Sequence, residues 1–332
     1  MCAETNSNLR NKEESEKYYD VRYSEAGSFA YMDDYWQDWK KKRIFDLIKE
    51  LDLPERGEAL DFGCGNGVFT DIIRQALPNY QVYGMDLSQA AIDIAKERYK
   101  ECLFFHSGDA SYNGKKFDFL FTHHVLEHVY DIEKVAEEIA DYMKPASTML
   151  HILPCGNKGS LEYNLCMLRK DGVNPDKGGV FFFEDKGHVR RLTTTQLSKI
   201  FSKEKFALIK DYYSEQYYGA LRWISEANPL TALKMANPFY GKDLEAKIKI
   251  LKIGALLVFL NLLRMPINIM NRLKSKRINN WKNNLLYTAS LIFYPLSHPF
   301  DAYIRERAEE EWRRRKKESN GSEMYLVFSQ PS

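Results

Sequence analysis

Residues 59–67 read ALDFGCGNG, and this stretch decides the fold. A short apolar strand leads straight into Gly63, Gly65 and Gly67, and a helical pattern of apolar residues begins at Val68. Glycines at such a turn let the backbone bend sharply and approach a ligand with no Cβ in between. Free N–H groups at the start of the following helix can meet a polar or anionic group. The stretch therefore predicts a ligand-binding loop, with a tight turn that binds nothing as the alternative.

Short apolar strands alternate with longer helices on both sides of this loop. We expect strands at 58–63, 81–87, 103–109, 117–123, 148–154, 206–213 and within 323–332. We expect helices at 36–51, 68–77, 88–100, 132–143 and 193–202. This alternation is typical of βαβ units around a parallel sheet. The predicted fold class is α/β, a Rossmann-like, doubly wound seven-stranded sheet with a mainly helical insertion before the last strand.

The chain divides into three parts by sequence character. Residues 1–16 are polar and predict a disordered tail without a signal peptide. Residues 17–215 together with 322–332 predict the α/β domain, and residues 216–321 predict a helical insertion that carries basic and apolar stretches. Aromatic residues crowd the segment 18–39, which predicts a helix at the domain edge and, as a second interpretation, a lid over a pocket.

Composition excludes several classes of protein. With 44% hydrophobic and 14% aromatic residues in 332, the chain has the material for a packed core, so disorder of the whole chain is excluded. A net charge of +2 argues against a general nucleic-acid-binding surface. The five cysteines contain no C-x-x-C pair, which argues against a disulfide framework or a zinc site and favours a cytoplasmic location.

Two acidic residues end the next two predicted strands. Asp86 lies 23 residues after Gly63, where a carboxylate can accept both hydroxyls of a ribose. Asp109 lies in the sequence SGDA at 107–110, where a side chain can reach the edge of an adenine. Both fall at the carboxyl ends of strands, where open α/β sheets bind ligands. The glycine spacing departs from the dinucleotide fingerprint G-x-G-x-x-G, but a nucleotide-dependent oxidoreductase stays open as an alternative of another class.

Together, D-x-G-x-G-x-G at 61–67, the acid of the second strand and the GDA stretch resemble the motifs of class I S-adenosylmethionine-dependent methyltransferases. LEHV at 126–129 and GHVRRLT at 187–193 are similar to the type 11/12 group, which includes the ubiquinone-biosynthesis O-methyltransferases. The resemblance spans residues 35–213 and the final strand. It implies S-adenosyl-L-methionine as the cofactor, bound by Asp61, Gly63, Cys64, Gly65, Asp86, Leu87, Asp109, Ala110 and His123.

Histidines supply candidates for acid–base chemistry. A hydroxyl acceptor gains about 10²–10⁴-fold from a base that removes its proton during transfer, and histidine suits that role near neutral pH. We expect His128 and His188 to act as base or acceptor-orienting groups, with Glu127 as an orienting partner. His124 lies four residues before His128 and shares its face if the segment is helical. A purely structural role is the alternative for each histidine, and for His151, inside a strand, it is the expected one.

Some ubiquinone-type members bind a divalent metal through E-x-L-E-H. In this chain His124 stands at the position of the first acid. The set His124, Glu127 and His128 suits a transition metal, whereas Mg²⁺ prefers oxygen ligands. We therefore predict no metal.

The insertion combines bases with apolar runs. Residues 246–300 contain nine Lys or Arg and no Asp or Glu. The apolar runs 253–263 and 285–296 are each too short to span a bilayer, and Arg264 and Pro266 interrupt any extension of the first. Basic flanks beside short apolar helices favour an interfacial position on an anionic membrane. A self-contained helical core, a lid or a dimer arm are the alternatives, and RNA binding is disfavoured because the bases alternate with aliphatic stretches.

The resulting functional prediction is an S-adenosylmethionine-dependent methyltransferase that acts on oxygen. The expected acceptor is amphipathic or lipid-linked, such as a glycolipid, a polyprenyl-linked saccharide or a quinone precursor. The expected location is cytoplasmic, peripheral on the cytoplasmic face of a membrane. A soluble small-molecule or sugar O-methyltransferase is the alternative within the same class. The sequence identifies neither the acceptor nor the oligomeric state.

Overall fold

The computed structural model describes residues 12–24, 38–184, 187–227, 229–273 and 280–330. These residues form two compact units. Unit 1 comprises the described residues within 1–154, 186–211 and 325–332, and unit 2 those within 155–185 and 212–324.

A seven-stranded sheet of order β3-β2-β1-β4-β5-β9-β8 forms the core of unit 1. β1 pairs in parallel with β2 and β4, β2 with β3, and β4 with β5. The central strands are almost continuously buried, as expected for a parallel sheet covered on both faces. This sheet confirms the predicted fold class. The strands are β1 Gly57–Phe62, β2 Tyr80–Asp86, β3 Leu103–His106, β4 Phe117–His123, β5 Met143–Pro154, β8 Ala207–Ser214 and β9 Glu323–Ser329.

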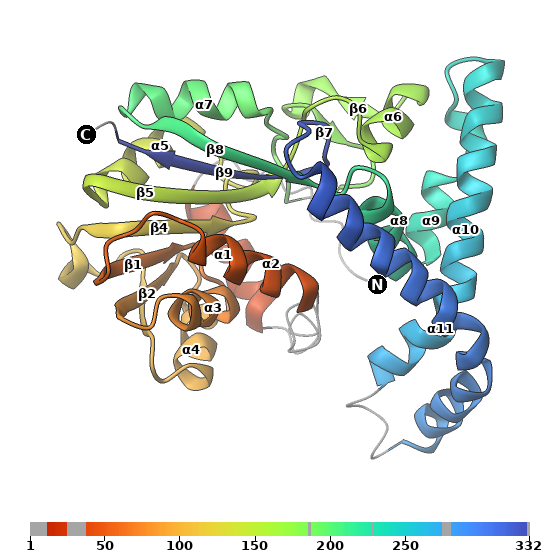
Figure 1. Cartoon of the computed structure of the whole chain (residues 1–332), viewed down its shortest axis with the longest axis horizontal. Coiled ribbons are helices and arrows are strands. Elements are labelled where there is room, and N and C mark those ends of the chain that lie inside the picture. Colours follow the sequence, from red (N-terminus) through yellow and green to blue (C-terminus); the bar gives the residue numbers. More distant parts are fainter. Residues whose placement is uncertain (1–11, 25–37, 185–186, 228, 274–279, 331–332) are drawn as a thin grey trace. The chain divides into compact units, whose positions relative to one another are not determined.

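Helices cover both faces of this sheet, with α7 on one side and α3 and α4 on the other (Figure 1). Their starts follow local capping chemistry. Ser88 caps α4, Asp131 caps α5, and Thr193 and Gln196 form a capping box at α7. The helices of unit 1 are α1 Lys12–Ser24, α2 Asp38–Lys49, α3 Val68–Ala76, α4 Gln89–Arg98, α5 Ile132–Asp141 and α7 Thr194–Lys203.

Three boundaries differ from the sequence prediction. Residues 12–16, expected in a disordered tail, form the first turns of α1, and Asp20 of this helix accepts a hydrogen bond from Ser88 (2.6 Å). β5 begins at Met143, where we expected a helix to end, because the pairing with β4 shifts register and accommodates the extra residues as a bulge. β3 ends at His106, before Asp109. The aromatic residues predicted at 29–36 lie outside the described residues.

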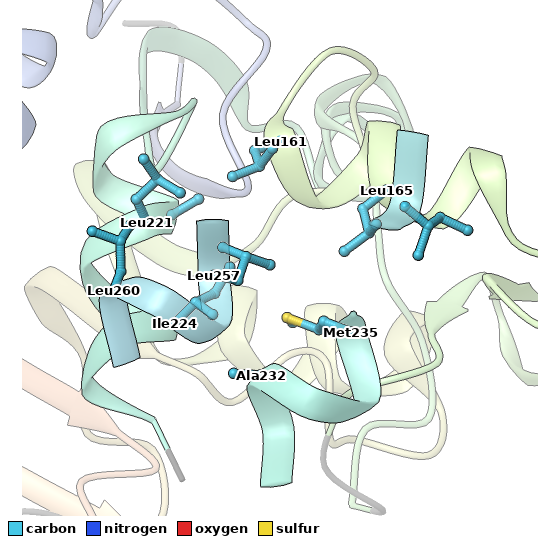
Figure 2. Close-up of a cluster of buried hydrophobic side chains, with 10 residues drawn as sticks. Leu161, Leu165, Leu221, Ile224, Ala232, Met235, Leu257 and Leu260 are labelled. Carbon is cyan, nitrogen blue, oxygen red and sulfur yellow. The ribbon is translucent and has the colours of Figure 1, made fainter. Parts of the chain in front are cut away.

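Unit 2 is mainly helical and has its own core. Leu161 and Leu165 of α6, Leu221 and Ile224 of α8, and Leu257 of α10 meet in one buried apolar cluster (Figure 2). We had assigned residues 155–185 to the α/β domain, but α6 places its apolar side chains in this cluster and the segment belongs to unit 2. Its helices are α6 Leu161–Leu168, α8 Tyr218–Glu226, α9 Pro229–Met235, α10 Leu244–Leu273 and α11 Trp281–Arg315, and β6 Val173–Asn174 and β7 Val180–Phe181 form a short antiparallel ribbon.

Two long helices, α10 and α11, pack against each other in unit 2. We expected the apolar run 253–263 to be too short to span a bilayer, with Arg264 and Pro266 interrupting its extension, whereas the helix α10 continues through both residues to Leu273. The Arg264 side chain is buried before the proline, where it contacts Asp301 and forms an ion pair with Glu226 (3.0 Å). After the proline, the Asn268 amide donates to the Ser225 carbonyl (3.0 Å), so the helix is anchored on either side of Pro266. By length and composition alone α10 is apolar enough to cross a membrane, a test that buried core helices also pass, and 39% of its apolar window is buried.

Candidate functional site

The glycine loop folds tightly against the end of β2. The N–H groups of Gly63 and Cys64 both donate to the carbonyl of Met85, at 2.8 and 2.9 Å. Gly63 has a φ of 78°, and a Cβ there would lie 2.4 Å from Cγ2 of Val125. Only glycine meets both the backbone conformation and this close approach. The loop at the carboxyl end of β1 is therefore formed as the sequence predicted.

Asp86 lies directly under this loop. One carboxylate oxygen accepts the N–H of Gly65 (2.8 Å), and the other accepts the N–H of Ser88 (2.9 Å). Burial raises the pKa of Asp86, and these hydrogen bonds act in the opposite direction. The following residue, Leu87, uses its carbonyl to contact Nε2 of His106 (2.8 Å). The acid of the second strand thus fixes the turn at which we expect a ribose.

Asp61 and Cys64 lie deeper than Asp86. Asp61 accepts a hydrogen bond from the hydroxyl of Thr70 (2.7 Å), and burial raises the pKa of its carboxyl to about 7. The Cys64 thiol packs in a core cluster with Ala95 and Phe104, and burial raises its pKa. The Cys64 side chain therefore lies in the core, and its backbone N–H and carbonyl are bonded to Met85 and Gly67 within the loop.

Asp109 and Ala110 lie on the exposed turn that follows β3. One oxygen of Asp109 accepts the N–H (3.0 Å) and the hydroxyl (2.7 Å) of Ser111, which lowers the pKa of Asp109. Ala110 begins a short 3-10 turn that ends at Tyr112. Both residues remain on the same rim of the sheet as Asp86, because β2 and β3 are parallel neighbours.

Helix α1 covers the glycine loop, a feature that the sequence indicated only through its aromatic residues. The hydroxyl of Tyr23 lies 2.5 Å from the point that a Cβ on Gly65 would occupy. Asp20 holds the helix to α4 by accepting hydrogen bonds from the Ser88 hydroxyl and the Ala90 N–H (2.6 and 3.3 Å). A side chain at position 65 would therefore collide with this cover.

The predicted catalytic residues meet after β4, around the buried carboxylate of Glu127. Nδ1 of His124 lies 2.7 Å from Oε1 of Glu127, and Nε2 of His128 lies 3.9 Å from the same oxygen. Burial alone would raise the pKa of Glu127, but the neighbouring histidines, His124 above all, lower it to about 2. His124 has a φ of 54°, so the backbone takes a left-handed conformation where the chain leaves β4.

His128 is held as a neutral imidazole in one tautomer. Its Nδ1 lies 3.0 Å from the carbonyl oxygen of Gly187. Since a carbonyl can only accept, Nδ1 carries the proton, and the lone pair is on Nε2, the atom nearer Glu127. Burial lowers the pKa of His128 to about 4. The His188 ring lies 4.7 Å away, centroid to centroid, so the structure brings the two predicted histidines together.

Arg190 and Val189 connect this cluster to a distant part of the chain. The N–H of Val189 donates to the carbonyl of Glu127 (3.0 Å). The Arg190 guanidinium donates to the carbonyls of Leu126, Val129 and Tyr130. We had noted this arginine in the GHVRRLT motif without assigning it a role. It holds the loop that carries Glu127 and His128 in place.

Two buried polar atoms at the cluster have no hydrogen-bond partner among the described residues. They are Oε2 of Glu127 and the hydroxyl of Tyr19. The Tyr19 ring lies 5.9 Å from the His128 ring, centroid to centroid. Buried polar groups are nearly always paired, so each of these two atoms is a candidate for a hydrogen bond to a polar ligand group.

His123 and His151, two further histidines considered above, have different surroundings. His123, predicted at the cofactor, is buried, and its ring lies 4.1 Å from that of Phe69. His151 contacts the Thr122 hydroxyl through Nδ1 (2.8 Å) and stacks on Phe201. Burial lowers the pKa of His151 to about 3. These contacts give His151 the structural environment that we expected.

Glu127, His128 and His188 also form a group that could hold a metal ion. Their ligand atoms lie within 4.8 Å of one another. Two imidazoles and one carboxylate suit a transition metal better than Mg²⁺. Our expectation that no metal binds stays a prediction.

Comparisons with known proteins bear on the family and on the fold. A family model described as a methyltransferase domain matches residues 35–210. Trans-aconitate 2-methyltransferase of Variovorax paradoxus is 25% identical over 121 residues, covering 36% of this chain and 47% of that protein. Demethylmenaquinone methyltransferase of Anoxybacillus flavithermus is 28% identical over 120 residues, covering 34% and 49%. The match thus spans about half the length of these relatives.

One solved structure is similar over nearly the whole chain. The crystal structure of the [4+2]-cyclase SpnF covers 97% of this chain and 97% of its own, with a TM-score of 0.51 and 14% identity. At that identity the likeness shows the fold alone.

Proposed function

Because this chain belongs to the methyltransferase-domain family, we propose that it transfers the methyl group of S-adenosylmethionine to a hydroxyl oxygen of an amphipathic or lipid-linked acceptor. The family match shows a methyltransferase domain and disfavours the oxidoreductase alternative. The cluster of Glu127, His128 and Tyr19 supports the choice of oxygen, because a hydroxyl acceptor gains from a base that removes its proton during transfer.

Two observations support binding of S-adenosylmethionine at the rim formed by the carboxyl ends of the strands. The glycine loop is held in one conformation at the carboxyl end of β1, because a Cβ at Gly63 or Gly65 would collide with its neighbours and their N–H groups donate to Met85 and Asp86. Asp86 is a carboxylate at the adjacent strand end. With Asp61, Asp109 and the segment around His123, these residues would hold S-adenosylmethionine, which supplies an electrophilic methyl group when bound.

The chain's own residues would orient and deprotonate the acceptor. Nε2 of His128 carries the free lone pair and takes the proton of the acceptor hydroxyl. The Glu127 carboxylate, 3.9 Å away, stabilises the imidazolium that forms. Oε2 of Glu127 and the Tyr19 hydroxyl provide the remaining hydrogen bonds to the acceptor. His124 keeps Glu127 ionised through the 2.7 Å contact.

The relatives' names leave the acceptor class open, since one names trans-aconitate and another demethylmenaquinone. A soluble small-molecule or sugar acceptor is therefore the second candidate. The lipid-linked acceptor is favoured by the apolar and basic character of residues 246–300.

The test is incubation of the purified protein with methyl-labelled S-adenosylmethionine and an extract of the source cells, followed by separation of lipid and aqueous phases. We expect label in the lipid phase, retained after mild alkali because a methyl ether survives it, and unaffected by a chelator. His128→Gln serves as the matched control and is expected to lose the label. Label confined to the aqueous phase would favour the soluble acceptor, and label on nitrogen would contradict O-methylation.

A further inference from the structure

Helix α11 has an inverted distribution of polar and apolar residues between Trp281 and Phe300. Its buried residues there are Ser290 and Ser297, one helical face seven residues apart. Both hydroxyls donate to the carbonyl four residues earlier, Ser290 at 2.8 Å and Ser297 at 3.3 Å. Small residues with self-satisfied hydroxyls are typical of helix contacts inside lipid. A helix in water normally buries its apolar side chains and exposes its polar ones, and this segment of α11 does the opposite.

The exposed face of the same helix is made of large apolar side chains. Leu285, Ile292 and Leu296 are 62%, 72% and 65% exposed. Steps of four and seven residues place them on one face with Trp281 and Tyr303, two aromatic residues at its ends. An apolar face with aromatic ends is the pattern of a helix at a membrane interface.

Helix α10 contributes a second exposed apolar stripe, opposite to its buried face. Leu244, Ile248, Leu251, Phe259 and Leu262 are exposed, and their spacing places them on one side of the helix. The other side of α10 packs Ile250, Leu257 and Leu260 into the core of unit 2. A row of large exposed apolar side chains along one side of a helix is the kind of surface that marks an interaction site. We call the exposed apolar residues of α10 and of α11 up to Tyr303 the apolar face.

Bases predominate around this apolar face, and the acids lie at its ends, Asp243 and Glu245 beside Leu244 and Asp301 near Tyr303. Residues 246–300 include no carboxylate, while Lys247, Lys252, Arg272 and Lys282 are exposed. Arg264, which we had included among the bases available to a membrane, is instead buried in its ion pairs and contributes nothing to the surface. The remaining bases can contact anionic lipid headgroups while the apolar residues contact the acyl chains beneath them, so the two together suit an acidic phospholipid bilayer.

We propose that the apolar face docks on an anionic lipid bilayer as an interfacial surface that does not cross it. Crossing is disfavoured because one side of α10 is committed to the protein core, so lipid cannot surround the helix. Pairing with a second copy is disfavoured because two basic surfaces would meet. This docking is independent of the acceptor chemistry proposed above.

The experiment is flotation of the full chain with phosphatidylcholine vesicles and with vesicles that also contain phosphatidylglycerol. We expect enrichment on the phosphatidylglycerol vesicles that weakens with added salt. The variant Ile292→Glu/Leu296→Glu changes two exposed positions, so we expect it to keep the fold. Because it replaces two apolar side chains of the apolar face by charged ones, we expect the partition coefficient onto the vesicles to fall by about tenfold or more. Ile209→Glu, at a 53% exposed aliphatic residue of β8 in unit 1, is the matched control and is expected to bind as the unmodified chain does.

Three outcomes would overturn the proposal. One is no enrichment on anionic vesicles, and another is equal loss of binding in Ile209→Glu. The third is a stable dimer by light scattering that Ile292→Glu/Leu296→Glu dissociates, which would assign the apolar face to a second copy. Binding of S-adenosylhomocysteine, measured on each variant, separates these results from a failure of the methyltransferase assignment.

Discussion

Replacing His128 by glutamine tests the assignment of the base. The imidazole donates from Nδ1 to the Gly187 carbonyl (3.0 Å) and presents its lone pair beside Glu127. Glutamine keeps a polar side chain but provides no comparable base. We expect kcat for methyl transfer to fall about 10²–10⁴-fold, equivalent to about 3–5 kcal/mol of barrier. Loss of one buried hydrogen bond costs about 1 kcal/mol of stability, which chemical unfolding would detect.

The pH dependence of kcat is a second test of His128 as the base, because the assignment predicts the direction in which turnover changes with pH. The pKa of His128 is held at about 4, so the base is neutral and ready throughout the neutral range. Turnover of the unmodified protein is expected to be flat between about pH 6 and 9 and to decline only as the pH approaches that low pKa. A decline centred near pH 6.5, or a His128→Gln variant within about threefold of normal turnover, would refute the role of a buried neutral base.

Three further substitutions separate the roles of other residues. Asp86→Asn leaves one of two buried N–H groups without a proper acceptor, so S-adenosylhomocysteine should bind about 5–150-fold more weakly by calorimetry, the equivalent of 1–3 kcal/mol. His188→Ala should lower turnover and leave that affinity unchanged, and an equal loss of affinity would place His188 in the cofactor site. His151 has a folded pKa of about 3, below its unfolded value of about 6.5, so its contribution to stability is full above pH 6.5 and is lost as the pH falls. His151→Leu should therefore reduce the loss of unfolding free energy between about pH 7 and 5 by about 2 kcal/mol, measured with urea, and an unchanged loss would contradict the assignment.

The α/β unit was predictable because each of its elements carries a local signal. Apolar runs, capping residues such as Ser88 and Thr193, and the glycines at 63–67 specify strands, helix starts and turns without reference to distant residues. The positions of Asp86 and Asp109 followed from the rule that parallel strands present their carboxyl ends at one rim.

Contacts between residues far apart in the sequence could not be predicted from local sequence patterns. Arg190 reaches carbonyls some sixty residues earlier, and Tyr19 meets His128 across the chain. No periodicity encodes such contacts. The continuation of α10 through Pro266 was missed for a similar reason, because packing of Ile267 and the Arg264 ion pairs offsets the local cost of proline.

The most direct test of the central claim is calorimetric titration of the unmodified protein with S-adenosylhomocysteine and, separately, with NADH. Binding of S-adenosylhomocysteine alone, weakened by Asp86→Asn, is the result that a methyltransferase rim at Gly63, Gly65 and Asp86 predicts. Saturable binding of NADH, or no binding of S-adenosylhomocysteine to the folded protein, would contradict it.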